Sequence, residues 1–271
     1  VAAAVLVVPI ATAIYDALGF AVAALTAVPT ILLSTTIAPM LVDLPAPARK
    51  RAPLAVGGIA VAAAVVALAV PKFTVALPQR TNVVFRQDDE GARVFVDTTW
   101  GPSTWGTAPR AMLDAVGDAS RVEPALPWMS PSRFADAPRL EVRPPAAEVL
   151  SIEDDGARRH VRARLRSSRG ASTIALVLPR GRHVEVKVEG RFAMPRPVAN
   201  GSMVGIFALP PDGVVVELDS PTSGPIPLTL LDRSSGVPAG TKAEDAVRAR
   251  PAEATTSQDG DVTVVSTFLS L

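Results

Sequence analysis

Apolar residues dominate the beginning of the chain and become sparser after Pro71. Residues 1–42 carry one formal charge, Asp16, and residues 54–70 carry none. A backbone inside lipid has to satisfy its own hydrogen bonds, which a helix of about 20 apolar residues does. Residues 1–42 would form about 63 Å of helix, twice the thickness of a bilayer core, so we expect them to fold back once. The pattern predicts a transmembrane segment over residues 1–71 with about three helices, the first of them truncated.

Charges near these apolar runs predict the orientation of the spans. Asp16 lies between Tyr15 and Gly19, a combination typical of an interfacial turn, although a lone acid within a span also marks ion or proton paths. Residues 49–51 read Arg-Lys-Arg, and short basic loops stay on the cytoplasmic side of a membrane. We therefore expect a multi-pass protein of the bacterial inner membrane, partnered by the lipid bilayer, with its C-terminal domain in the periplasm.

Beyond the apolar segment, the spacing of apolar residues changes to that of β-strands. Val184, Val186 and Val188 alternate with charged residues, the pattern of a strand with one wet face. Residues 174–178 are continuously apolar, which predicts a strand buried on both faces. Comparable runs predict further strands over residues 83–86, 93–97, 148–153, 158–166, 204–209, 214–218, 226–231 and 262–269. Many short strands favour a mainly-β domain over residues 72–271, folded as an antiparallel β-sandwich or jelly roll.

One helix is expected to interrupt these strands. Pro109 suits a first helical turn, and Gly117 is a typical terminator. Met112 and Val116 lie one turn apart on its buried stripe. Residues 238–260 lack apolar periodicity and are expected to form a long surface loop. The predicted fold class is therefore membrane α-helices followed by a mainly-β domain with one short helix.

Composition narrows the set of partners. Lysine and arginine together number 27 against 26 acidic residues, a net charge of +1, which offers no electrostatic case for nucleic acid. The absence of cysteine excludes disulfides and thiol chemistry. Arginine far outnumbers lysine, and alanine, valine and proline are abundant, a composition typical of GC-rich bacterial genomes. The chain begins at Val1 without a methionine or a basic leader, so we expect it to start inside a longer protein.

Few residues suit catalysis. Metal-dependent hydrolysis requires several His, Asp or Glu ligands that converge on one ion. The two histidines, His160 and His183, each lie on an arginine-flanked predicted strand, without ligand spacing around them. The acidic pairs at 88–89 and 154–155 lie beside turn glycines, where aspartate favours the turn itself. We therefore expect neither a catalytic residue nor a metal or cofactor site here.

Two surfaces are candidates for interaction. Arg162, Arg164 and Arg166 fall on one face of a predicted strand. They could contact lipid phosphates or an acidic partner surface, or form a solvated face balanced by nearby acids. Trp100 and Trp105 could form a platform on which a sugar stacks, or pack into the core or against another domain. The sequence alone leaves both alternatives open.

Five segments share their order with a known family: residues 77–88 (LPQRTNVVFRQD), 92–97 (ARVFVD), 166–171 (RSSRGA), 230–238 (LLDRSSGVP) and 261–267 (DVTVVST). With the apolar runs before them and the tryptophan-rich stretch between, they resemble the C-terminal region of membrane-bound zinc exopeptidases of the aminopeptidase clan MH. Relatives in that clan include the vacuolar membrane protease, the endoplasmic reticulum metallopeptidase and bacterial homologues. The resemblance covers nearly the whole chain.

The resemblance implies a parent protein in which a di-zinc peptidase domain precedes the membrane helices and removes N-terminal amino acids from peptides. None of that family's zinc ligands, nor its catalytic glutamate, can be placed on this sequence. The chain is then expected to be the membrane anchor and non-catalytic accessory β-domain of such an enzyme. Its partners would be its own upstream peptidase domain and, through that domain, a peptide substrate, with zinc expected only there. The alternative is a self-contained, membrane-anchored periplasmic binding module for a glycan or an envelope protein, which the tryptophans would favour.

Overall fold

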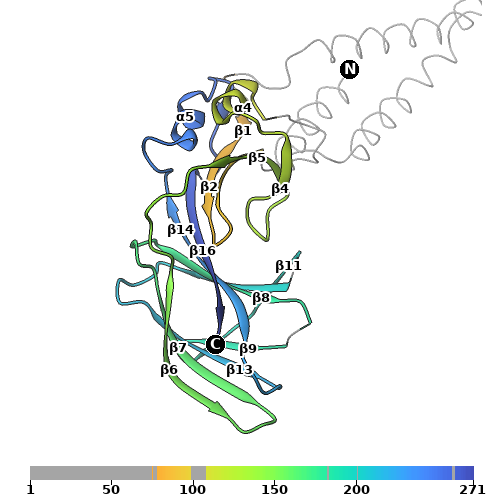
Figure 1. Ribbon diagram of the computed structural model, residues 1–271, viewed down its shortest axis with the longest axis vertical. Coiled ribbons are helices and arrows are strands. Elements are labelled where there is room, and N and C mark those ends of the chain that lie inside the picture. Colours follow the sequence, from red (N-terminus) through yellow and green to blue (C-terminus); the bar gives the residue numbers. More distant parts are fainter. Residues whose placement is uncertain (1–74, 76–77, 99–107, 182, 200, 258–259) are drawn as a thin grey trace, which may run out of the picture. The chain divides into compact units, whose positions relative to one another are not determined.

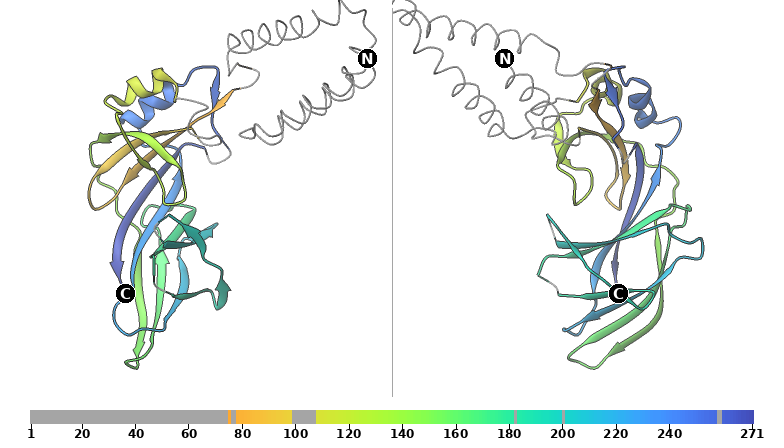
Figure 2. Two further views of the ribbon diagram at one scale, coloured as in Figure 1. Left: turned by 90° about the vertical axis from the view of Figure 1, so that its right-hand side faces the viewer. Right: turned by 180° about the vertical axis from the view of Figure 1, so that it is seen from behind.

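A computed structural model of the protein describes residues 75, 78–98, 108–181, 183–199, 201–257 and 260–271. The chain divides into two compact units, residues 1–77 with 100–106, and residues 78–99 with 107–271. Every described helix and strand belongs to the second unit, which Figures 1 and 2 show in colour.

The strands of the second unit are β1 (Gln79–Arg80), β2 (Asn82–Gln87), β3 (Ala92–Asp97), β4 (Arg121–Pro124), β5 (Pro131–Ala137), β6 (Ala146–Asp154), β7 (Arg159–Arg166), β8 (Thr173–Pro179), β9 (Glu185–Val188), β10 (Arg191–Ala193), β11 (Arg196–Val198), β12 (Gly201–Phe207), β13 (Val214–Ser220), β14 (Pro227–Ser235), β15 (Ala254–Thr255) and β16 (Val262–Ser270). Its described helices are α4 (Arg110–Val116) and α5 (Lys242–Arg248).

Nine strands form the larger sheet, in the order β11-β12-β8-β14-β16-β2-β3-β5-β4. Neighbouring strands are antiparallel, except that β16 runs parallel to β2, with Val262 opposite Val84. The two longest members, β14 and β16, have nine residues each and pair along their whole length. They occupy the middle of the sheet and connect its two halves (Figure 1).

A smaller sheet of five strands, in the order β10-β9-β13-β7-β6, packs against the half of the larger sheet that contains β8 and β12. Its inner face contributes Leu165, Val216 and Leu218, and the larger sheet contributes Leu176 and Leu230, all completely buried. Alternate residues of β7 and β13 point into this core because successive side chains of a strand point to opposite faces.

The two helices cover the other half of the larger sheet. Met112 and Val116 of α4 and Ala243 and Ala246 of α5 are completely buried, and they pack against β2 and β3. Residues paired across β14, β16 and β2 share a face of the sheet, and their register places the helices on the face that also meets the smaller sheet.

The opposite face of the larger sheet is covered in part by the loop between β4 and β5. Ala125 and Leu126 of that loop pack onto Phe95 and Phe134, whose ring centroids lie 5.2 Å apart. Over β14 and β16 this face is only partly covered, since Thr229 and Ser266 are half-buried and Phe268 is exposed, and we call it the open face.

Most of the strands predicted from periodicity are confirmed, with limits that agree to within a few residues. The strand predicted over 262–269 is β16, and the apolar run at 174–178 is β8, which is buried along most of its length. The predicted helix is α4, and it ends at Gly117, whose φ of 91° lies in the left-handed region.

The prediction of a long loop over residues 238–260 is wrong. This segment contains α5 and the short strand β15, which pairs with β1. The fully buried residues of α5 are both alanines, Ala243 and Ala246, so the sequence shows little contrast between an apolar and a polar face. The helix is stabilised by packing against α4, which its own sequence does not indicate.

The predicted fold class is also wrong. The described residues form mixed β-sheets with two helices, and the predicted membrane α-helices are not found among them. Each described helix has seven residues, about 10 Å of length against the roughly 30 Å of a bilayer core. No helix in the described ranges is long and apolar enough to cross a membrane. The spans predicted for residues 1–71, with Asp16 and the basic loop at 49–51, lie outside the described residues.

Candidate functional site

Two adjoining cavities, of about 350 and about 450 Å³, hollow the open face of the larger sheet. Four residues line both of them: Arg86, Pro127, Thr229 and Phe268. The first cavity is also lined by Asp88, Asp89, Glu90, Ala125, Leu126, Leu231, Val264, Ser266 and Thr267, and the second by Glu123, Pro124, Val177, Pro179, Ala199, Pro227 and Leu228. We call the two together the open-face groove.

The floor of the groove consists of short or medium side chains on the two central strands. Thr229 and Leu231 of β14 and Val264 and Ser266 of β16 face it. The residues between them, such as Leu230, point to the opposite side and into the core. Because the floor side chains are not bulky, the walls formed by the β4–β5 loop and the β2–β3 turn enclose an unfilled space.

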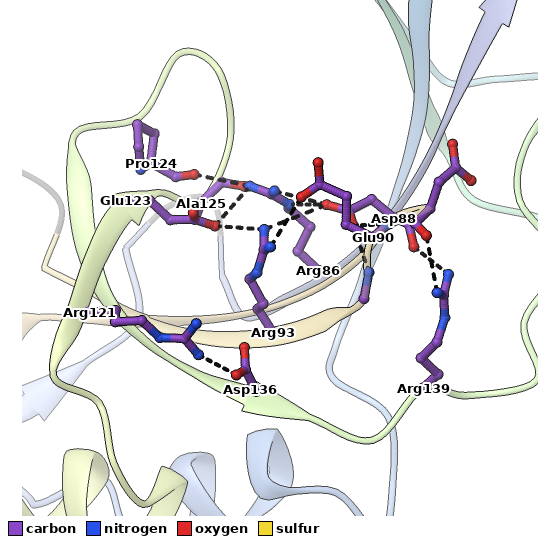
Figure 3. A network of polar contacts seen from close by, with 12 residues as sticks. Arg86, Asp88, Glu90, Arg93, Arg121, Glu123, Pro124, Ala125, Asp136 and Arg139 are labelled. Atoms are coloured by element: carbon purple, nitrogen blue, oxygen red, sulfur yellow. Dashed lines mark hydrogen bonds and ion pairs between the residues drawn. The ribbon is translucent and has the colours of Figure 1, made fainter.

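Five charged residues gather at one end of the groove, and we call them the acid–arginine cluster (Figure 3): Arg86 on β2, Asp88 and Glu90 in the β2–β3 turn, Arg93 on β3 and Glu123 on β4. Arg86 Nη2 lies 2.9 Å from Asp88 Oδ2, and Arg93 Nη2 lies 3.2 Å from Glu90 Oε2. Glu123 Oε1 lies 3.1 Å from Arg93 Nη1 and 3.6 Å from Arg86 Nη1, so this carboxylate bridges the two arginines.

Aromatic rings lie beneath the arginines on this face. The guanidinium carbon of Arg86 lies 5.6 Å from the ring centroid of Phe95, and that of Arg93 lies 5.6 Å from the centroid of Phe134. Arg121 approaches the Phe134 ring to 4.6 Å. Each such contact contributes about 0.5–1 kcal/mol at a partly exposed site. The rings therefore help to hold the guanidinium groups against the sheet.

The β2–β3 turn is held by the side chain of Asp88. Its Oδ1 accepts hydrogen bonds from the amides of Glu90 and Gly91, both at 3.0 Å, and Arg139 donates to its main-chain oxygen at 2.5 Å. Burial of the Asp88 carboxyl group opposes ionisation, but Arg86 and the turn amides outweigh that effect and lower its pKa below the ordinary value. The Asp88 carboxylate is therefore ionised at neutral pH and pairs with Arg86.

The chemistry available in the groove is that of binding. A nucleophile or a general base has to reach a reacting group, and the cluster carboxylates are instead engaged by arginines and turn amides. None of the described residues that line the groove is histidine or cysteine. The groove offers an aromatic ring, proline surfaces and main-chain groups, which suit recognition of an extended ligand.

The arginines predicted as an interaction surface lie elsewhere. Arg162, Arg164 and Arg166 occupy the outer face of β7 in the smaller sheet, opposite the buried side chains of the same strand. Arg164 Nη1 lies 3.6 Å from Glu148 Oε2 on β6, and Arg162 is paired in register with Glu217 on β13. The structure thus brings the three arginines into one row, where acids on neighbouring strands lie beside Arg162 and Arg164, and keeps them apart from the groove.

Of the three tryptophans, Trp128 alone lies within the described residues. Trp100 and Trp105 lie outside the described residues. Trp128, in the β4–β5 loop, is 38% exposed and lines a small cavity with Met129 and Val262. A stacking platform made by Trp100 and Trp105 therefore stays a prediction.

No group of three or more His, Cys, Asp or Glu residues in the described ranges is arranged to hold a metal ion. His160 is half-buried on β7, and His183 is exposed just before β9. The Asp154 and Asp155 carboxylates accept hydrogen bonds from the amides of their own turn, first of all those of Gly156 and Arg158 respectively, and this lowers the pKa of both. These acids have the local turn function that their position beside a glycine predicts.

Three of the family-like segments meet in one buried polar network. Asp232 is completely buried; Arg169 Nε donates to its Oδ1 at 2.9 Å and Ser167 Oγ to its Oδ2 at 2.5 Å. Arg169 also donates to Ser234 Oγ at 2.8 Å and to the main-chain oxygen of Thr263 at 2.9 Å. The network ties the segment after β7 to β14 and β16, so these motif residues hold the fold together.

Sequence reasoning missed the groove. Its walls come from residues 86–90, 123–127, 177–179, 227–231 and 264–268, which are separated by long stretches of chain. The one signal available beforehand was the Asp-Asp-Glu-Gly turn, which we interpreted as a hairpin turn and nothing more. No family model matches the chain, and no curated protein is significantly similar to it.

Proposed function

We propose that this chain supplies a non-catalytic accessory β-domain to a zinc-dependent exopeptidase of the aminopeptidase type. The proposal starts from the five segments that resemble the aminopeptidase clan. In that arrangement, peptide-bond hydrolysis and zinc belong to another domain of the same protein, and the β-domain contributes a rigid scaffold with a binding surface.

The observation that carries the proposal is the position of the chemically capable motif residues. Arg169, Asp232, Ser167 and Ser234 are four of the polar residues in two family-like segments, and they hydrogen-bond to one another within the fold. Asp232 has no exposed surface, so a substrate has no access to its carboxylate. Residues used in this way stabilise the junction of strands, which is the role expected of a scaffold.

Zinc does not fit the described residues. A catalytic zinc requires three protein ligands around an open position. The described ranges contain no such group of His, Cys, Asp or Glu side chains. The proposed hydrolysis therefore depends on another domain of the protein.

The coding sequence that surrounds this chain tests the proposal. A zinc exopeptidase domain is expected in the same reading frame, upstream of Val1. The protein made from that frame should release N-terminal residues from aminoacyl substrates and lose this activity with a zinc chelator. The separately purified 271-residue chain, assayed in parallel, should release none. A reading frame without a peptidase domain, or activity in the separate chain, would overturn the proposal.

A further inference from the structure

The central strand β16 continues beyond the end of its neighbour β2. The two strands pair from Val262 to Val265, and β2 ends at Gln87. β16 continues to Ser270 and pairs with β14 throughout. Among the described strands, residues 266–270 therefore have a partner on one side only. We call the other side of this segment the β16 edge.

The hydrogen-bond pattern shows which main-chain groups this edge presents. Ile226 and Leu271 exchange two main-chain hydrogen bonds, of 2.5 and 3.0 Å, next to the first pair of the β14–β16 ladder. In an antiparallel ladder such pairs alternate, so the amides and carbonyls of Phe268 and Ser270 point away from β14. The Phe268 amide donates to Asp89 Oδ2 at 3.0 Å, which confirms this direction. A carboxylate thus takes the place of a strand at the start of the edge.

The β16 edge opens into the groove. Phe268 lines both cavities, and its side chain is 61% exposed on the open face. Pro127, Pro179 and Pro227 line the second cavity with it. A strand laid along the edge would extend its main chain beside residues 266–270 and direct alternate side chains onto the open face next to Phe268, while the second cavity lies beyond Phe268 over β14 and β8. Main-chain donors and acceptors thus occur beside an exposed aromatic ring.

Charge gives the edge a preference among extended ligands. Asp88, Asp89 and Glu90 lie at the mouth of the first cavity, and Arg86 is the cation among its described lining residues. Arg93 and Arg139 contact the same turn from outside the cavity lining, through Glu90 and the main-chain oxygens of residues 88 and 89. The cavity itself presents a surplus of carboxylates, which favours a ligand with positive charge.

We propose that the β16 edge and the open-face groove bind an extended, basic peptide segment of a partner protein by strand addition. The segment would pair with the main-chain oxygen of Phe268 and the main chain of Ser270, place an apolar side chain over Phe268 and direct a lysine or arginine toward Asp89 and Glu90. This inference goes beyond the proposed function and does not depend on it.

The edge strand β6 of the smaller sheet is a weaker site for the same mode. Val149, Leu150 and Ile152 are exposed there, but the β6–β7 register shifts between Val149 and Ser151. Such a bulge disrupts the regular edge that a further strand requires. Neither cavity of the open-face groove is lined by a residue of β6.

The test measures binding of fluorescein-labelled peptides of about seven residues to the full chain by fluorescence anisotropy. One peptide alternates valine with lysine, a second alternates valine with glutamate, and a third is the lysine peptide with proline at its central positions. The lysine peptide should bind most tightly, by about threefold to tenfold over the glutamate peptide, and this margin should shrink with added salt. The proline peptide should not bind, because it cannot donate to the edge.

Variants of the edge decide where the peptide binds. Ser270→Pro removes an amide that points away from β14 and should weaken binding at least about tenfold. Ser235→Pro is the matched control at the other end of the same strand pair, where Ser235 lies opposite Val262, and it should leave affinity unchanged. Phe268→Ala keeps the main chain and should weaken binding about threefold to tenfold through lost apolar contact. Unchanged thermal unfolding of each variant confirms that it is folded.

Several outcomes would overturn the inference. These are no saturable peptide binding, equal binding by wild type and Ser270→Pro, or equal binding of the proline peptide. Binding of oligosaccharides in the groove, together with no binding of the peptides, would assign the groove to a glycan. A dimer that dissociates on Ser270→Pro, without peptide binding, would assign the edge to a second copy of the chain.

Discussion

Two arginine-rich surfaces of this protein differ in how they are built. On β7, Arg162, Arg164 and Arg166 alternate along one strand and face outward from the smaller sheet. On the open face, Arg86 and Arg93 come from two strands, lie over aromatic rings, and have side chains only 21% and 19% exposed. The first surface is a regular consequence of strand alternation. The second depends on strand register, and it stands beside a groove.

Burial is the difference that decides what each arginine contributes. Ion pairs between exposed side chains contribute about 0–1 kcal/mol, because water screens them and the side chains lose entropy. Partly buried ion pairs are screened less by water than exposed ones. Where one partner is fully buried, removal of the other strongly destabilises the fold, because an unpaired charge then remains in the interior. The pair of Arg169 and the completely buried Asp232 is more buried than either of these surfaces.

The largest effect on the free energy of unfolding is therefore expected at this buried pair. Arg169→Met leaves the Asp232 carboxylate without its cation, and should lower the free energy of unfolding by about 3–5 kcal/mol. Urea unfolding followed by circular dichroism measures this change. Asp232→Leu in the same chain should restore a large part of the loss, because no unpaired charge then remains. A single-variant loss below about 1 kcal/mol would contradict a structural role for this ion pair.

A smaller loss is expected in the acid–arginine cluster. Arg93→Met removes contacts to Glu90 and Glu123 and the stacking on Phe134. We expect a loss of about 1–2 kcal/mol in the free energy of unfolding, since methionine keeps part of the apolar contact. The same urea titration at low and high salt separates the ionic part. An unchanged free energy of unfolding would show that this cluster contributes no more to stability than the exposed arginines of β7.

The charge of Asp88 predicts a pH dependence of about 1 kcal/mol or less. Its pKa is lowered in the folded protein, so its stabilisation is complete above the unfolded pKa, which is about 3.9, and is lost as pH falls through the folded pKa. Asp88→Asn should therefore be less stable than wild type at pH 7, and the two should converge below about pH 4. Unfolding free energies measured from pH 7 to pH 2 test this. A constant difference over that range would contradict an ionic contribution.

The smallest effect is expected on the outer face of β7. Arg162→Met, the counterpart of Arg93→Met, should change the free energy of unfolding by no more than about 0.5 kcal/mol. Its side chain is exposed, and its cross-strand neighbour Glu217 already lies 4.0 Å from Lys187. A loss as large as that of Arg93→Met would mean that exposure does not separate the two surfaces.

The sequence predicts strands well where alternation is strong. The buried positions Val161, Ala163 and Leu165 and the outward arginines between them lie as expected. β4 and β5 were missed because Arg121–Pro124 and Pro131–Ala137 mix proline and charge without a regular apolar period. These two strands are stabilised by their neighbours rather than by their own pattern.

The candidate site was beyond sequence reasoning for a related reason. A groove is defined by which strands become neighbours, and the β16–β2 contact joins residues about 178 positions apart, as between Val83 and Asp261. In the sequence, Arg86 and Asp88 are indistinguishable from the polar residues of any hairpin. Only the fold shows that Glu123 and Phe268 lie beside them. The family-like segments drew attention to polar residues such as Arg169 and Asp232, which form a buried hydrogen-bonded network away from the groove.

The central position of β16 has a consequence for synthesis of the protein on the ribosome. This strand fills the place between β14 and β2, so the larger sheet stays in two incomplete parts until residues 262–270 have emerged. Until then, the nascent β2–β3 hairpin has an unpaired edge and an apolar surface that can aggregate. Pairing across such a long separation is intrinsically slow. The larger sheet is therefore expected to close only after residues 262–270 have left the ribosome, and until then to depend on factors that shield exposed strands.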